Sequence, residues 1–188
     1  MSPRTIPYLC ALAFWIGCEA KIYTFHVEES GQVLVERGTL LEDLLGDLGF
    51  DSFLDMDITA TDEFVNQGVE PGDVREVFLD LFELEAISPG GADLSFLESI
   101  EIYVESPDLP SVLIASADDF PEGQSLVVFE LEDADLTDYV VSQSMTFTTD
   151  ITGHRPDEDT TVEARFDLAV GVTTQGACSQ IRGKGDSG

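Results

Sequence analysis

Two histidines and three cysteines are the residues of this chain best suited to nucleophilic or transition-metal chemistry. His26 lies in the strand-like segment YTFHVEE, and His154 lies in the turn-rich segment GHRPDEDT. Neither the G-x-S-x-G elbow of hydrolases nor a recognisable Ser–Lys arrangement accompanies them, although distant residues can still meet in a triad. A zinc site draws on several cysteine and histidine ligands, which the sequence does not gather. We therefore expect no catalytic residue, no zinc site and no cofactor.

Carboxylates are far more abundant, and they gather in DMDITATDE, ELEDADLTD and PDEDTT. Calcium takes carboxylate oxygens, but none of these segments has the glycine-containing spacing of an EF-hand loop. Because 38 residues are Asp or Glu, such clusters arise by chance, and solvated surface is the preferred interpretation. For the same reason no carboxylate pair can be singled out for glycoside hydrolysis. The alternative, a calcium site, would draw on Asp55, Asp57, Asp62, Asp133, Asp135, Asp157 and Asp159.

The net charge restricts the partners of the protein. Lysine and arginine number 8 against 38 acids, which gives a formal charge of -30. Such a field repels nucleic-acid phosphates and anionic lipid headgroups, so neither is expected as a direct partner. It attracts divalent cations and basic partners instead. Most carboxylates must face water, since the basic residues between positions 22 and 172 are Arg37, Arg75, Arg155 and Arg165.

The start of the chain has the pattern of a signal peptide, expected over residues 1–17. Arg4 supplies a positive charge before an apolar run at residues 6–16. That run is shorter than the ~18–20 residues that a membrane-spanning helix needs. An ordinary secretory signal of this kind would leave a secreted or periplasmic protein.

Gly17 and Cys18 also resemble the lipobox of bacterial lipoproteins, in which a small residue precedes the cysteine that is lipidated. The sequence departs from that family at Trp15, where leucine is preferred. The resemblance implies that Cys18 carries the lipid and that residues 18–21 form a short tether. Because Glu19 rather than aspartate follows the cysteine, the implied location is the outer membrane.

Alternation of apolar and polar residues predicts strands through most of the body. GHRPDEDT, between SMTFTTDIT and TVEARFDLAVGV, has the composition of an antiparallel hairpin loop. VREVFLDLFELEAI changes its apolar face, which predicts a bulge or bend near Leu81–Phe82. Glu101 and Glu105 should be exposed. The inward faces are expected to carry Ile100, Ile102, Val104, Met145, Phe147, Thr149, Ile151, Val162, Ala164, Phe166, Leu168 and Val170.

One longer helix is predicted in TLLEDLLGDLG, where Thr39 and Glu42 have the spacing of a capping box and Gly49 can end the helix. Shorter turns are expected at TDEFVNQG and ADLSFLES. A leucine stripe on such a helix usually packs on a sheet, and the alternative is a ligand-facing lid over a lipid-sized cavity. The stripe consists of Leu41, Leu44, Leu45 and Leu48.

These patterns predict an all-β domain at residues 22–172. We expect an antiparallel two-layer β-sandwich, immunoglobulin-like in general architecture, with short helices in its connections. Residues 173–188 lack periodicity and should form a disordered tail, which carries Cys178, a residue of open role.

The runs FVNQGVEPGDVREVFL and DLSFLESIEIYVESPDLPSVLIA resemble a group of bacterial envelope lipoproteins that has no assigned activity. The expected function is therefore that of a non-enzymatic, lipid-anchored cell-envelope protein that binds or organises a partner at the outer membrane. Its membrane contact would be the lipid anchor, and its partner an envelope protein or a small apolar ligand. One alternative is a lipid or small-ligand carrier that uses the sandwich interior, and another is a hydrolase that uses dispersed carboxylates.

Overall fold

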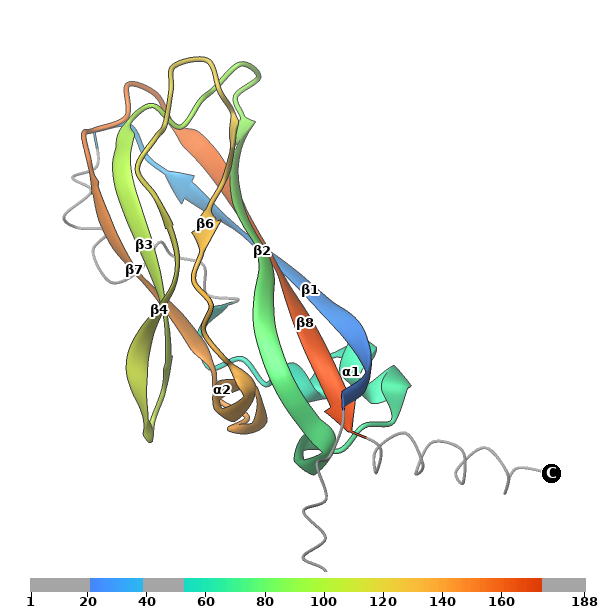
Figure 1. Ribbon diagram of the computed structural model, residues 1–188. Coiled ribbons are helices and arrows are strands. Elements are labelled where there is room, and N and C mark those ends of the chain that lie inside the picture. Colours follow the sequence, from blue (N-terminus) through green and yellow to red (C-terminus); the bar gives the residue numbers. More distant parts are fainter. Residues whose placement is uncertain (1–20, 39–52, 174–188) are drawn as a thin grey trace, which may run out of the picture.

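The computed structural model describes residues 21–38 and 53–173, in which eight strands form two four-stranded antiparallel sheets around a shared core (Figure 1). The first sheet has the order β1–β8–β2–β5, and its strands are Lys21–Val35, Thr160–Thr173, Val74–Ser88 and Leu126–Val128 respectively. The second sheet has the order β6–β4–β3–β7, with strands Glu130–Leu131, Leu109–Ala117, Leu97–Ser106 and Thr146–Gly153. The prediction of an all-β, two-layer antiparallel sandwich is confirmed.

Short helices lie in the connections, as expected. They are η3 (Ile58–Ala60), α1 (Asp62–Gln67), η4 (Pro71–Asp73) and α2 (Thr137–Val141). α1 forms at the predicted TDEFVNQG turn, where the Thr61 hydroxyl accepts a hydrogen bond from the Phe64 N–H and Gly68, at φ 62°, ends the helix. ADLSFLES forms a turn without a helix, in which the Leu97 N–H donates to the Leu94 carbonyl at 2.9 Å.

The core contains a cluster of phenylalanine rings between the two sheets. Phe166 of β8 is fully buried and meets Phe147 of β7 edge to face, with ring centroids 4.8 Å apart. The ring of Phe53 also packs edge to face on Phe166, with ring centroids 5.2 Å apart. Such edge-to-face pairs add to the stabilisation that burial alone supplies. The predicted inward faces of β3 and β8 are confirmed, since these residues are buried: Ile100, Ile102, Val104, Val162, Ala164, Phe166, Leu168 and Val170.

Two residues of the second sheet differ from expectation. Thr149 of β7 is half-buried rather than buried, whereas Met145, Phe147 and Ile151 are buried as predicted. Glu105, expected to be exposed, is half-buried because it lies at the end of β3 beside β7, where it accepts a hydrogen bond from the Thr148 hydroxyl at 3.3 Å.

The change of face in β2 is produced by a bulge, as predicted, and the bulge lies about one residue earlier, at Asp80. Leu79 is opposite Leu168 and Leu81 is opposite Asp167, so Asp80 is the extra residue. The extra residue lets both Leu79 and Phe82 enter the core although an odd number of positions separates them. The bulge also turns the Asp80 carboxylate toward solvent.

The predicted hairpin between β7 and β8 is wrong. β7 pairs with β3 in the second sheet, whereas β8 pairs with β1 and β2 in the first sheet. The connecting loop therefore crosses between the sheets, and it is held by hydrogen bonds from the His154 N–H to the Phe96 carbonyl and from the Gly38 N–H to the Pro156 carbonyl. Turn-rich composition indicates a change of direction, but it does not specify the sheet that the chain joins next.

Glu29 is a half-buried carboxylate on β1, in the same alternating register as the buried Phe25 and Val27. Burial raises the pKa of Glu29, and the nearby Glu63 carboxylate raises it further. Ionisation of Glu29 therefore destabilises the fold above its folded-state pKa, and this cost disappears below the ordinary value of 4.5. We expect Glu29→Gln to raise the melting temperature at neutral pH and to have no such effect below about pH 4.

The exposed Glu98 of β3 supplies the matched control. Melting curves of Glu98→Gln should follow those of the wild type more closely at neutral pH. A Glu29→Gln gain that persisted in acid, or that Glu98→Gln reproduced, would contradict burial as its cause.

Candidate functional site

An open hollow of about 290 Å³ lies at the seam where β5 of the first sheet meets β3 and β4 of the second. We call it the seam hollow. Polar atoms make up most of its exposed lining, and its apolar floor is limited to Val127 and to Ala117, which ends β4, while Ile100 is fully buried. The remaining lining residues are Ser99, Glu101, Ser116, Asp118, Asp119, Val128 and Glu130. The hollow thus combines an apolar floor with a carboxylate-rich rim.

The seam is formed by one continuous segment that passes from the first sheet to the second. β5 pairs with β2, and the Phe129 N–H then donates to the Phe82 carbonyl at 3.0 Å. β6 follows at once and pairs with β4. The buried Phe129 ring packs edge to face on Phe82 with centroids 5.0 Å apart. The crossing, and with it the wall of the seam hollow, is therefore fixed by the core.

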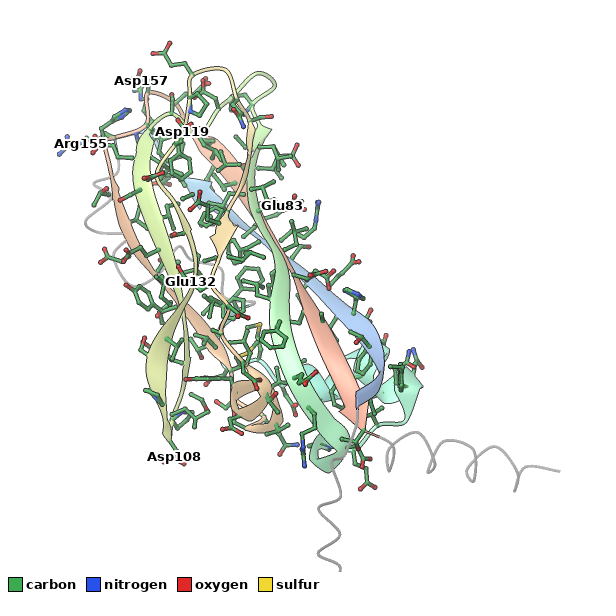
Figure 2. The ribbon with its side chains drawn as sticks, viewed as in Figure 1. Glu83, Asp108, Asp119, Glu132, Arg155 and Asp157 are labelled. Atoms are coloured by element: carbon green, nitrogen blue, oxygen red, sulfur yellow. The ribbon has the colours of Figure 1, made fainter. Side chains whose placement is uncertain are left out.

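The rim of the seam hollow is strongly negative. Asp118, Asp119 and Glu130 are exposed, and none of the residues that line the hollow is a lysine or an arginine. Figure 2 shows Asp119 at the end of the sandwich that also carries Asp157. Glu101 accepts a hydrogen bond from the Tyr103 hydroxyl at 2.6 Å, which raises the pKa of Tyr103. The rim therefore favours a cation, and the floor favours an apolar group.

Exposed apolar side chains adjoin the seam hollow on the outer face of the first sheet. Val128 is 58% exposed and Leu126 is 37% exposed, and they lie opposite Glu83 and Glu85 of β2. Ile87, farther along β2, is also exposed. Single exposed apolar residues are common on protein surfaces, but a group beside a pocket is typical of a binding surface.

Arg165 organises the carboxylates in the middle of this outer face. Its guanidinium donates to Glu83 of β2 at 2.6 Å and to Glu163 of β8 at 2.8 Å. Glu163 also accepts a hydrogen bond from the Gln32 side chain of β1 at 2.9 Å. Glu163 and Glu83 together raise the pKa of Arg165. The arginine is therefore committed to neutralising two neighbouring acids, and Figure 2 shows Glu83 on the side of β2 that faces away from the second sheet.

Three potential metal ligands meet on the same face. His26 Nδ1 of β1 lies 3.0 Å and 2.9 Å from the two carboxylate oxygens of Asp167 on β8, and 4.0 Å from Asp80 Oδ2 on the β2 bulge. Burial raises the pKa of Asp167, His26 lowers it, and the carboxylates of Glu28 and Asp80 raise it. Among the described residues, this is the group whose ligand atoms all lie within 4.8 Å of one another.

A second hollow, of about 400 Å³, lies among the loops at one end of the sandwich, and we call it the loop-end hollow. Figure 2 shows Asp157, which lines it, at the same end of the sandwich as Arg155. Asp93 also lines it, and hydrogen bonds from the Gly123 N–H and from Ser95 lower the pKa of Asp93. The Asp93 carboxylate is thus already used to connect two loops.

The predicted calcium ligands do not gather around a shared position in the structure. Some of them accept hydrogen bonds from residues two positions along the chain: Asp57 accepts from the Thr59 N–H and hydroxyl, and Asp135 accepts from the Thr137 N–H and hydroxyl. None belongs to the one described group with ligand atoms in reach of a shared ion. The others lie as follows: Asp55 accepts from Ser144, Asp62 lies in the first turn of α1, Asp133 is in an exposed loop, Asp157 lines the loop-end hollow, and Asp159 accepts from the Arg37 N–H.

The two histidines do not assemble a nucleophilic site among the described residues. His26 hydrogen-bonds to Asp167, and His154 Nδ1 lies 3.3 Å from the Arg155 carbonyl oxygen. No hydrogen bond in the described part of the chain joins either ring to a serine or threonine hydroxyl. These residues therefore give no sign of catalysis.

Several predicted residues lie outside the described ranges. These are Cys18, Cys178 and the leucine stripe of Leu41, Leu44, Leu45 and Leu48. The roles expected for them stay predictions. Within the described ranges, sequence reasoning missed the seam hollow and the meeting of His26 with Asp80 and Asp167. For the second of these, the sequence signal was the outward position of His26 and Asp167 in two alternating strands, but alternation does not show that those strands are neighbours.

In the part of the chain that the structure describes, no helix has the length and apolar character needed to cross a membrane. No family model, no curated protein and no solved structure matches the chain.

Proposed function

We propose that the protein is a non-enzymatic, lipid-anchored cell-envelope protein that binds a basic protein partner at the outer membrane through the seam hollow. The leader pattern that ends at Cys18 supports the anchor and the location. The observation that carries the binding role is the seam hollow itself, with its apolar floor, its carboxylate rim and the exposed Val128 beside it.

The chemistry of the hollow selects for lysine or arginine side chains on the partner. Such side chains have an aliphatic stem and a charged head, so the stem can lie on Val127 and the exposed Val128 while the head meets Asp118 or Asp119. The formal charge of -30 adds a long-range attraction that speeds the encounter with a basic protein.

A carrier function receives less support, because a carrier needs room between its sheets. The described interior is filled where the sheets meet, with the rings of Phe53, Phe147 and Phe166 within 4.8–6.1 Å of one another. A hydrolase using carboxylates would need a raised-pKa acid inside a cleft. Among the described residues, the two carboxylates with raised pKa are Glu29 and Asp167, and they line neither the seam hollow nor the loop-end hollow.

Site-specific photocrosslinking in living cells tests the binding role. A benzoylphenylalanine side chain in place of Val128 should give a discrete product with a basic envelope protein. The matched control is Val65, a valine of α1 that is 61% exposed, compared with 58% for Val128. α1 contacts β1, which is the opposite edge of the first sheet from β5. The Val65 position should therefore give no such product.

Charge dependence separates this interface from a merely apolar contact. Neutralising the rim with Asp118→Asn, Asp119→Asn and Glu130→Gln should abolish most of the Val128 product. Neutralising three acids outside the hollow, Glu70, Asp73 and Asp108, changes the net charge equally and should leave the product in place. Figure 2 shows Asp108 at the far tip of the β3–β4 hairpin. A product insensitive to the rim, or equal crosslinking from Val65, would refute a basic partner in the seam hollow.

A further inference from the structure

His26, Asp80 and Asp167 come from three adjacent strands of the first sheet. β8 lies between β1 and β2, so Asp167 has the strand of His26 on one side and the strand of Asp80 on the other. His26 is opposite Ala169, one outward position from Asp167, and the small side chain of Ala169 leaves the imidazole free to lean toward the carboxylate. On β2, the bulge supplies Asp80 as an extra outward residue next to Leu81, which pairs with Asp167.

We propose that these three side chains form a binding site for a divalent transition-metal ion of the zinc class, independent of the seam hollow. The imidazole Nδ1 and one oxygen of each carboxylate would be the ligands. The site faces solvent, since the side chains of His26 and Asp80 are 47% and 63% exposed.

The present spacing is close to that of a metal centre. Ligand atoms at ~2.0–2.2 Å from a tetrahedral zinc ion are separated from one another by about 3.3–3.5 Å. The observed separations from His26 Nδ1 are 2.9 Å to Asp167 and 4.0 Å to Asp80, which lie on either side of that value. To bind the ion, the Asp167 carboxylate would move slightly away from His26 Nδ1, and the exposed Asp80 side chain would rotate toward it. The sheet backbone can stay as it is.

The local charge balance favours a dication. Asp80, Asp167 and Glu28 place three carboxylates around an imidazole that carries at most one positive charge. The closest arginine along β8, Arg165, is already paired with Glu83 and Glu163. A bound dication would remove the repulsion among the carboxylates.

The ligand set also selects the class of metal. Calcium and magnesium prefer oxygen ligands alone, whereas zinc, copper and nickel accept imidazole nitrogen together with carboxylate oxygen. Three protein ligands on an open face leave at least one coordination position for water or for a donor atom of another molecule. We therefore expect selectivity for zinc-class ions over calcium in spite of the many carboxylates.

Isothermal titration of the full chain with zinc sulfate tests the site, after its thiols have been blocked with N-ethylmaleimide. The titration is performed in about 1 M NaCl, where the Debye length of about 3 Å suppresses diffuse cation binding. We expect one saturable zinc site that calcium and magnesium do not compete for. His26→Ala and Asp167→Asn should each weaken it by about tenfold or more, and Asp80→Asn should weaken it as well. The matched control, His154→Ala, should bind zinc as the wild type does.

Two further measurements guard against misfolding and adventitious binding. The melting curve of metal-free His26→Ala should show a folded protein, and the electron paramagnetic resonance spectrum of the copper complex should show coupling to one imidazole nitrogen in the wild type and to none in His26→Ala. Zinc affinity unchanged by His26→Ala, equal loss in His154→Ala, or no saturable binding in high salt would each overturn the proposal. None of these results would bear on crosslinking at Val128.

Discussion

Replacing Phe166 with alanine is expected to lower the free energy of unfolding by about 3–5 kcal/mol. Phe166 is fully buried on β8, the strand that pairs with both β1 and β2. Its ring contacts those of Phe53 and Phe147, which come from outside the first sheet. The substitution would therefore remove apolar burial and leave a cavity that three separate parts of the chain cannot all move to fill. Urea unfolding followed by circular dichroism measures the loss.

Val65→Ala is the control for this experiment, because it also shortens an apolar side chain but at a position that is 61% exposed. Its effect should stay within about 0.5 kcal/mol, as is usual for surface substitutions. If Phe166→Ala lowered the free energy of unfolding no more than Val65→Ala does, the result would contradict the burial of Phe166 between the two sheets.

The second large effect concerns the proposed anchor. Cys18→Ala should move the protein almost completely from the membrane fraction to the soluble fraction. Each acyl methylene buried in a bilayer contributes ~0.8 kcal/mol, so the two or three chains of a lipoprotein cysteine hold a protein firmly. The formal charge of -30 gives the protein itself no attraction for anionic headgroups that could replace them. Fractionation with a high-salt wash measures the distribution.

Cys178→Ala is the matched control, since it removes a thiol from the opposite end of the chain. It should remain with the membrane as the wild type does. Retention of Cys18→Ala in the washed membrane fraction would contradict the lipobox interpretation and would require another means of attachment.

The sequence predicted those features of the fold that depend on local alternation. The inward face of β8 from Val162 to Val170 was predictable because a strand with one face on the core alternates buried and outward residues. The β2 bulge was predictable as well, because no regular strand can place both Leu79 and Phe82 in the core.

Strand pairing between distant segments was not predictable in this way. Val127 and Phe129 are both buried, as in one continuous strand, yet the chain exchanges β2 for β4 as its partner at Phe129. Alternation specifies which face of a sheet a side chain occupies, but it does not specify which other strand pairs with the segment. The seam hollow arises from this exchange of partners, so local alternation could not predict it.

The acidic groups show the same distinction between proximity in sequence and proximity in space. Asp55 and Asp57 are neighbours in the chain, but they accept hydrogen bonds from Ser144 and Thr59 respectively rather than facing a shared ion. Asp80 and Asp167 are far apart in the chain and belong to no sequence cluster, yet both lie within reach of His26. Pairing of β1 and β2 with β8 brings them together, and that pairing is a property of the whole fold.

Binding at the seam hollow of the anchored protein is tested by photocrosslinking from Val128 in intact cells, performed in the wild type and in Cys18→Ala and followed by membrane fractionation. We expect a discrete product with a basic envelope protein in the membrane fraction of wild-type cells. The product should be lost when the rim acids Asp118, Asp119 and Glu130 are neutralised, and it should be strongly reduced when Cys18 is replaced. A product that forms equally well without Cys18 and without the rim charges would contradict both the anchored location and the binding role of the seam hollow.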